Sequence, residues 1–475
     1  MTNPPILSMS DSLPITKGRI ADFAEDPAVC MRNLWAAHGE VAALEEGYHR
    51  LYFVFGPTYT RQVLSDSQRF HSQFFAIRGP RKSAQRRVTS GLLTMNGETH
   101  KQHRRMVMGP FQKRSVSAYH ETIVEVARSA TEDWKVGQVR DLASEMTQYM
   151  LRLTSSILFG IDLPELAFRV GALTERWVTL NHQAGPSAFF SNEETPALYK
   201  KLLAAAEELE ESVKEMIQIR RSGKLGFDVL SLLIRAHEAE SGVNDEQLIG
   251  HIVLLFGAAH LTSAHTLTWT LFLMAQHPEV MQKLYQEMGE VLQGRPPGPA
   301  DLECMPYLDL ALKESMRILP ASSYSQRVTA EPVELGPFQL QRGSSIIFSQ
   351  FMTHHLPSIY IQPERFWPER WESINPSPYA YLPFGAGPRM CVGAALGMMQ
   401  LKITLPMLLS RFKMTVVPHA EINPHIMSTM LFPTTPVPVR LSEHDGRFES
   451  SPVQGTIHSM VTLPEPLFES QQRVA

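Results

Sequence analysis

The chain has 475 residues, of which 43% are hydrophobic and 19% are charged, and its formal net charge is −4. This length supports a large buried core, and the near-neutral charge excludes nucleic-acid binding driven by overall charge. Three scattered cysteines exclude a disulfide framework and a cysteine-based zinc site, and they fit a reducing cytoplasm.

The N-terminal segment, residues 1–29, begins without a secretory signal. It lacks a basic start and a continuous apolar core, and Pro4, Pro5 and Pro14 interrupt it. We therefore expect a cytoplasmic protein with no N-terminal membrane anchor.

Helices are predicted to predominate in the rest of the chain. A strand is predicted at residues 49–56 (HRLYFVFG), whereas the chain from about Pro110 to Pro278 is mostly helix-forming. Strand-like segments return only at residues 333–349 and 435–441. After Ser442 the sequence is polar and aperiodic, so a loosely ordered tail is expected over residues 443–475.

One predicted helix is much longer than average. Asn244 and the acidic residues after it are typical of a helix N-terminus, and His277-Pro278 is a stop signal. The helix between them has about 33 residues and a length of about 50 Å. Its apolar stretch, residues 252–275, is long enough to span a membrane, but its histidines and hydroxyl side chains would lack partners in lipid. We expect a helix that crosses the protein.

Cys391 lies in the segment FGAGPRMCVGAALGMMQLK, residues 384–402, among glycines and directly before a helix-like run. A lone cysteine beside apolar residues is usually an inert buried thiol. Glycines, however, let backbone amides approach a ligand closely, and a helix N-terminus stabilises the thiolate, which is the form that binds metals.

This segment resembles the heme-binding signature of the cytochrome P450 family, Phe-x-x-Gly-x-Arg-x-Cys-x-Gly. Its defined positions are Phe384, Gly387, Arg389, Cys391 and Gly393. The resemblance implies the soluble bacterial type of the family: one mainly α domain with small β-sheets over residues 30–442, and a long central helix over one heme b. It also implies that Cys391 is the axial ligand of the heme iron and that Arg389 pairs with a heme propionate.

Other matches follow in the family's order. Further residues implied to contact the heme propionates are His100, Arg104 and, by position, Arg327. Residues implied to hold the scaffold beside the heme are Glu314, Arg317 and, within FWPERW, Arg370. Without the resemblance, the Glu314–Arg317 pair would be interpreted as an ordinary surface ion pair.

The central helix departs from the family pattern. The family usually has Ala/Gly-Gly-x-Asp/Glu-Thr-Thr/Ser, and this chain has AAHLTS at residues 258–263. Ala258 is implied to lie against the heme, and the hydroxyl residues Thr262 and Ser263 are kept. Leu261 replaces the acid.

The replacement matters because splitting bound dioxygen requires protons, and leucine can neither bind nor relay one. His265, three residues after Thr262, flanks the same face of the helix and is a candidate proton donor. The alternative is that His265 caps a backbone carbonyl of a buried helix. His260 is interpreted as packing or as polar lining.

The resemblance implies that loops near the distal face contact the substrate, and the aromatic and methionine residues of these loops suggest an apolar, adaptable pocket. Candidate lining residues are Phe74, Phe75, Phe189, Phe190, Met427, Met430 and Phe432. A local basic run consists of Arg78, Arg81, Lys82, Arg86 and Arg87. This run is either a solvated loop or a site for a carboxylate-bearing or carrier-bound substrate.

The resemblance also implies a separate electron donor, because the chain has no room for a fused flavin domain and no iron–sulfur cysteines. Electrons from NAD(P)H would arrive through a ferredoxin or flavodoxin and its reductase. The basic residues expected to form the docking face for such an acidic carrier are Lys101, Arg105, Lys113 and Arg114.

The expected function is that of a heme-thiolate monooxygenase acting on an apolar small molecule in specialised metabolism. The change at Leu261 keeps an alternative open, namely oxidative coupling, cyclisation, desaturation or peroxide-dependent oxidation without oxygen insertion. A heme-based sensor is disfavoured because no signalling module is attached and Thr262 is kept.

Overall fold

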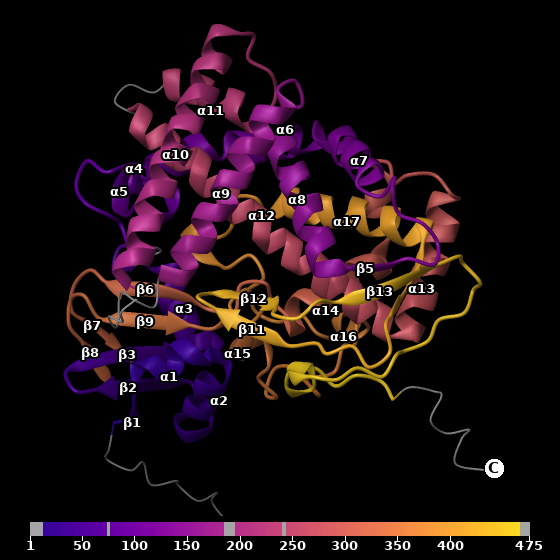
Figure 1. Ribbon diagram of the computed structural model, residues 1–475. Coiled ribbons are helices and arrows are strands. Elements are labelled where there is room, and N and C mark those ends of the chain that lie inside the picture. Colours follow the sequence, from indigo (N-terminus) through magenta and orange to yellow (C-terminus); the bar gives the residue numbers. More distant parts are fainter. Residues whose placement is uncertain (1–12, 74–76, 185–194, 240–243, 466–475) are drawn as a thin grey trace, which may run out of the picture.

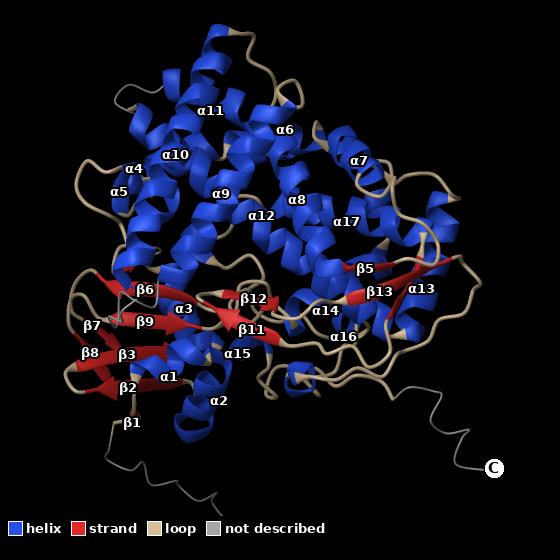
Figure 2. Ribbon diagram, in the orientation of Figure 1, coloured by secondary structure: helices blue, strands red, loops and turns tan. Residues whose placement is uncertain are grey.

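The computed structural model describes residues 13–73, 77–184, 195–239 and 244–465. Helices form most of the molecule, and the strands lie along one side of it (Figures 1 and 2). The helices are α1 (Ile20–Glu25), α2 (Pro27–His38), α3 (Pro57–Ser65), α4 (Ala84–Val88), α5 (Gly97–Val107), α6 (Lys113–Ser117), α7 (His120–Ser129), α8 (Leu142–Phe159), α9 (Pro164–Ala184), α10 (Thr195–Ser222), α11 (Val229–Ala239), α12 (Asp245–Gln276), α13 (Pro278–Leu292), α14 (Pro306–Ile318), α15 (Gln350–His354), α16 (Arg370–Ser373) and α17 (Ala394–Arg411). The predicted mainly α fold is confirmed.

The strands form one larger sheet and three small ones. They are β1 (Ile15–Lys17), β2 (Val41–Glu46), β3 (His49–Val54), β4 (Phe70–Ser72), β5 (Val139–Asp141), β6 (Ser325–Thr329), β7 (Val333–Leu335), β8 (Phe338–Leu340), β9 (Ser345–Phe348), β10 (Lys413–Val416), β11 (Pro424–Met427), β12 (Met430–Pro433) and β13 (Pro438–Ser442). The six-stranded sheet has the order β1-β2-β3-β9-β6-β4. In it, Ser72 of β4 pairs with Arg327 of β6, which places both at the edge of the cavity described below.

The three strand-like segments identified in the sequence are confirmed, as β3, as β7 to β9, and as β13. The remaining strands were not predicted, because they are only three to six residues long and several of them pair with strands far away in the sequence. One such pair joins β4 to β6 in antiparallel orientation, with Phe70 opposite Thr329.

Helix α12 is the predicted long helix and runs through the centre of the molecule (Figure 1). At its start, the Asn244 side chain accepts from the Gln247 N–H at 3.0 Å, and the Gln247 side chain accepts from the Asn244 N–H at 3.1 Å. This reciprocal capping box fixes the N-terminus. The helix is long and apolar enough to cross a membrane, but it packs against α8, α9, α14 and α17 and most of its second half is buried. It is therefore a core helix.

Glu314, Arg317 and Arg370 form a buried ionic cluster between α14 and α16. Arg317 donates two hydrogen bonds to the Glu314 carboxylate, at 2.8 and 2.9 Å, and Arg370 donates a third at 2.9 Å. The Trp371 indole N–H and the Trp367 backbone N–H also donate to this carboxylate. The Glu314 and Arg317 side chains have no exposed surface, so the interpretation as a surface pair is wrong.

The expectation of a loosely ordered tail is wrong for residues 443–465. Ile457, Met460 and Val461 are buried in the main core, and Thr462 bridges to Arg365. The apolar residues in this polar stretch are too irregularly spaced to indicate a helix or strand, yet they pack against elements that precede them in the chain. Residues 466–475 lie outside the described residues.

The N-terminal segment also belongs to the fold from residue 13 onward. Strand β1 extends the six-stranded sheet by pairing in parallel with β2, with Ile15 opposite Ala43. Helix α1 contributes the buried Phe23. The expected boundary at residue 30 therefore divides a continuous structural unit.

Candidate active site

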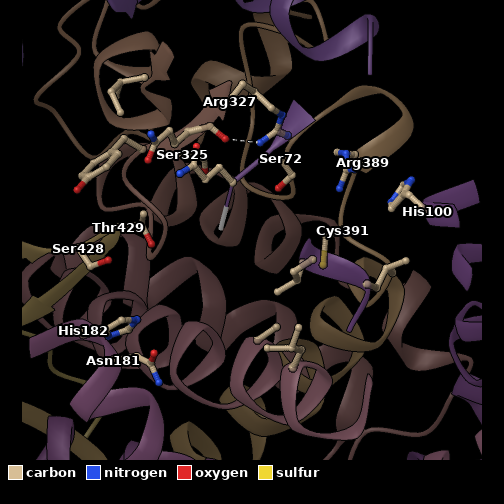
Figure 3. Close-up of a pocket in the computed structure, with 18 of the residues that line it drawn as sticks. Ser72, His100, Asn181, His182, Ser325, Arg327, Arg389, Cys391, Ser428 and Thr429 are labelled. Carbon is tan, nitrogen blue, oxygen red and sulfur yellow. Dashed lines mark hydrogen bonds between the residues drawn. The ribbon is translucent and has the colours of Figure 1, made fainter. Parts of the chain in front are cut away.

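A cavity of about 330 Å³ lies between α12 and the loop that carries Cys391 (Figure 3). This volume is within the range of small-molecule and cofactor sites. On the α12 side the cavity is lined by Leu254, Leu255 and Ala258, and on the opposite side by residues 389–392. It is lined further by His100 and Arg104 of α5, Asn181 and His182 of α9, residues 325–327, and Ser428 and Thr429 between β11 and β12.

The loop before α17 presents the Cys391 side chain to this cavity. The Cys391 N–H donates to the Phe384 carbonyl at 2.8 Å, which closes the loop. Gly387 has a positive φ of 72°, and a side chain there would collide with the Leu64 carbonyl oxygen, so this position requires glycine. Burial raises the pKa of the Cys391 thiol, while the Gly393 N–H and Arg104 act in the opposite direction. A cation bound at the sulfur would favour the thiolate.

Four basic side chains gather beside Cys391, at one end of the cavity (Figure 3 labels three of them). Burial, together with Arg389, Arg104 and Arg327, lowers the pKa of His100 to about 4. Burial and Arg389 lower the pKa of Arg327 to about 9, and burial and Arg104 lower that of Arg389 to about 10. No described carboxylate lines the cavity, and the Arg389 Nε is buried without a hydrogen-bond partner among the described residues.

This arrangement fits a heme. Its iron would take the Cys391 sulfur as a ligand, and its two propionates would supply the negative charge that the basic cluster lacks. His100, Arg104, Arg327 and Arg389, predicted from separate parts of the sequence, are thus brought together in the structure.

Thr262 lies one helical turn after Ala258 on α12. Its hydroxyl donates to the Ala258 carbonyl at 2.6 Å, and its own carbonyl accepts from the Thr266 hydroxyl at 2.8 Å. Because the Thr262 hydroxyl acts as the donor in its bond to Ala258, its oxygen can still accept a hydrogen bond. The helix continues without a break through this turn. Thr262 and Ser263 are not among the described residues that line the cavity.

A second cavity, here called the lateral cavity, borders α12 one turn beyond Thr262. Its lining residues are Asp141, Ala143, Ser144, Thr147, Gln148, Glu175, His265, Phe432 and Pro433. His265 lines this cavity and is not among the described residues lining the one beside Cys391. Its ring stacks on Phe432 with 5.7 Å between ring centroids.

The structure does not support the alternative that His265 caps a carbonyl through its Nδ1. Nδ1 is buried and has no hydrogen-bond partner among the described residues. Burial, with smaller contributions from His260 and His182, lowers the pKa of His265 to about 3, so its imidazole is neutral at pH 7.

Sequence motifs assigned no role to His354, which the structure places in the scaffold. The His354 Nε2 accepts from the Leu382 N–H at 2.7 Å, so the proton is on Nδ1, which donates to the Arg317 carbonyl at 3.1 Å. The imidazole thereby joins the ionic cluster on α14 to the segment that leads into the Cys391 loop.

The substrate-side predictions need correction at the hairpin of β11 and β12. Its tip residues Ser428 and Thr429 line the cavity beside Cys391, whereas Phe432 lines the lateral cavity. Neither cavity has Met427 or Met430 among its described lining residues. The remaining predicted residues, Phe74, Phe75, Phe189 and Phe190, lie outside the described residues.

The basic run at residues 78–87 is partly engaged within the protein. Arg87 forms an ion pair with Glu210, and Arg78 donates to the Thr94 carbonyl at 3.0 Å. On the expected docking face, Lys101 pairs with Glu98 at 2.5 Å. Arg105, Lys113 and Arg114 are exposed there.

Fold and site together define a heme-thiolate protein: a mainly helical domain in which one cysteine faces a long helix across a cavity with a basic end. Comparison with known proteins gives the family. The family model for cytochrome P450 matches residues 16–442, and the chain belongs to this family. The match begins before the expected boundary at residue 30.

Similar proteins include enzymes of terpene metabolism. Cyclooctat-9-en-7-ol 5-monooxygenase of Streptomyces melanosporofaciens is 30% identical over 391 residues, which are 80% of this chain and 84% of that protein. Pentalenene oxygenase of Streptomyces avermitilis is 28% identical over 407 residues, covering 84% and 89%. The structure of cyanobacterial CYP120A1 bound to retinoic acid superposes with a TM-score of 0.76 at 21% identity, covering 88% of this chain and 95% of that one, and shows the shared fold. The protein is a cytochrome P450 monooxygenase.

Proposed function

We propose that this enzyme inserts one atom of dioxygen into a neutral terpene hydrocarbon or terpene alcohol. The distribution of charge in the cavity carries this proposal. Its charged described residues, Arg104, Arg327 and Arg389, lie at the propionate end, so no described cation remains to recognise a substrate carboxylate. The terpene relatives support the same substrate class.

The end of the cavity away from the basic cluster suits an apolar molecule with at most a single hydroxyl group. Figure 3 shows Asn181, His182, Ser428 and Thr429 there, apart from His100 and Arg389. The Asn181 side chain already accepts from Gln85 and donates to the Trp177 carbonyl. Its remaining N–H and the two hydroxyls can orient one polar group of the substrate.

The residues of the chain divide the work of the reaction. When heme is bound it supplies the iron that activates dioxygen, and the Cys391 thiolate donates electron density to that iron. Its propionates would be held by Arg104, Arg327, Arg389 and His100. The Thr262 hydroxyl oxygen accepts a hydrogen bond from a proton carrier and, after rotation of the hydroxyl, can pass a proton toward the cavity that Ala258 lines one turn earlier.

A separate ferredoxin or flavodoxin in the cytoplasm is proposed to supply the electrons. Three exposed cations, Arg105, Lys113 and Arg114, support this docking face. Arg105 follows Arg104, which donates to the Met390 carbonyl at 2.7 Å, so α5 adjoins the Cys391 loop. Lys101 contributes less because Glu98 neutralises it.

Product analysis under labelled dioxygen tests the proposed substrate class. Pentalenene and cyclooctat-9-en-7-ol would be incubated with the enzyme and a surrogate ferredoxin system, with retinoic acid and retinol as a pair that differs in the carboxylate. We expect one labelled oxygen in a neutral substrate and tighter binding of retinol than of retinoic acid. Preference for the acid would contradict a neutral substrate, and a product lacking two hydrogens and the label would support oxidation without insertion.

Thr262→Ala is expected to raise the hydrogen peroxide released per NAD(P)H consumed, with little change in substrate affinity. Alanine removes a hydroxyl that lies one turn after the cavity-lining Ala258 and is able to carry a proton. Thr262→Ser, which keeps a hydroxyl, is the matched control and should remain close to the wild type. Equal peroxide release from all three proteins would show that Thr262 is not on the proton path.

A further inference from the structure

The proton supply to Thr262 is the open question of this site, because Leu261 stands where an acid is usual. Buried titratable groups beside α12 are therefore of interest. His260 and His265 both lie on this helix, and the His260 side chain is only 1% exposed. Both ring nitrogens of His260 and the Nδ1 of His265 are buried without a hydrogen-bond partner among the described residues. Leaving such groups unpaired costs free energy, which favours a role in proton handling over a purely structural one.

A carboxylate outside α12 lies beside these histidines. Glu175 of α9 places its Oε2 3.6 Å from the His260 Nε2, and its side chain is 30% exposed. Glu175 and His265 also line the same lateral cavity. Glu175 is thus in contact with solvent and close to the buried imidazole of His260. It also lines the same cavity as the imidazole of His265.

His265 connects this cavity to Thr262. It follows Thr262 by three residues, so the two side chains are neighbours on the helix surface. A neutral imidazole can accept a proton on one ring nitrogen and release one from the other, and no net charge remains on the ring. His265 is therefore suited to pass protons rather than to store them.

We propose that Glu175 is the acid that replaces the missing one at position 261, and that protons cross the lateral cavity to His265 and then to Thr262. Solvent protonates the Glu175 carboxylate, and Glu175 releases this proton into the lateral cavity. One ring nitrogen of His265 accepts a proton from the cavity, and the other ring nitrogen releases one toward Thr262. His260 is a positioning residue that holds Glu175 at the cavity. This proposal rests on dioxygen activation by the enzyme.

The first test compares Glu175→Gln and His265→Phe with wild type in the holoenzyme, using pentalenene or whichever neutral terpene of the panel yields product. Because general acid catalysis contributes about 10²–10⁴-fold, we expect product formation to fall by on the order of 10²-fold. Peroxide release per NAD(P)H should rise, and the substrate dissociation constant should not change. The matched control is Glu165→Gln, which removes an exposed carboxylate from the first turn of the same helix α9.

A rescue experiment separates a proton path from a structural role. Leu261→Glu restores an acid beside Thr262. It should therefore lower the peroxide released per NAD(P)H in Glu175→Gln to the wild-type level, and it should not do so in Thr262→Ala. The proposal is overturned when Glu175→Gln releases no more peroxide per NAD(P)H than Glu165→Gln, or when adding Leu261→Glu leaves the peroxide release of Glu175→Gln unchanged. Failure of the proposed function would be recognised separately, because the wild-type product would then lack the labelled oxygen.

A third comparison tests the positioning role of His260. His260→Phe removes the side chain beside Glu175 and leaves the carboxylate in place, so its peroxide release per NAD(P)H should lie between those of wild type and Glu175→Gln. Peroxide release equal to that of wild type would remove His260 from the proposal.

Discussion

Replacing Cys391 by serine is expected to abolish the carbon monoxide difference band of thiolate-ligated heme, and dioxygen activation with it. A serine hydroxyl is not an anion at neutral pH and cannot donate electron density to iron as a thiolate does. The loop itself should persist, since the bond from residue 391 to the Phe384 carbonyl uses the backbone N–H.

The reduced protein under carbon monoxide gives the readout, and heme content is measured in parallel. Cys304→Ser is the matched control because Cys304 is a free, exposed cysteine outside the cavity. It should retain the band in full. A Cys391→Ser protein with the same band would show that another residue binds the iron.

Glu314→Gln is expected to destabilise the protein by about 3–5 kcal/mol, the usual range when one partner of a buried ion pair is removed. Glutamine has the size of glutamate, but it leaves the buried guanidinium groups of Arg317 and Arg370 without the negative charge that both contact. Because His354 links Arg317 to the Cys391 loop, heme retention should also fall.

Chemical denaturation of the holoenzyme, followed by heme absorbance, measures this effect. Glu303→Gln is the control, since Glu303 is an exposed glutamate that lies eleven residues before Glu314 in the chain. Its effect should be below about 1 kcal/mol, as for other exposed charges. An equally small effect of Glu314→Gln would mean that the cluster adds little to stability.

The features that the sequence predicted correctly are local in the chain. The Cys391 loop contains the hydrogen bond from the Cys391 N–H to the Phe384 carbonyl and two glycines, Gly385 and Gly387, whose positive φ favours glycine, so one contiguous motif indicates it. The ends of α12 were predictable for the same reason, because Asn244 caps a helix that starts at the next residue and Pro278 follows its end.

The features that the sequence did not predict depend on contacts between distant segments. The three-residue strands β1 and β4 exist because they pair with β2 and β6, and their own residues show no periodicity long enough to indicate a strand. Residues 443–465 are ordered by packing that no local pattern encodes. The ion pair between Arg87 and Glu210 joins positions that are 123 residues apart in the chain.

The sequence by itself thus determined the family, the Cys391 loop and the central helix, because each follows from residues within a few positions of one another. Only the tertiary structure decided that the four basic residues share one end of a cavity, that His265 borders the lateral cavity, and that Glu175 lies beside His260. The physical reason is that burial and electrostatic coupling depend on which helices pack together, and helical spacing along α12 cannot show which side chains α9 places opposite it.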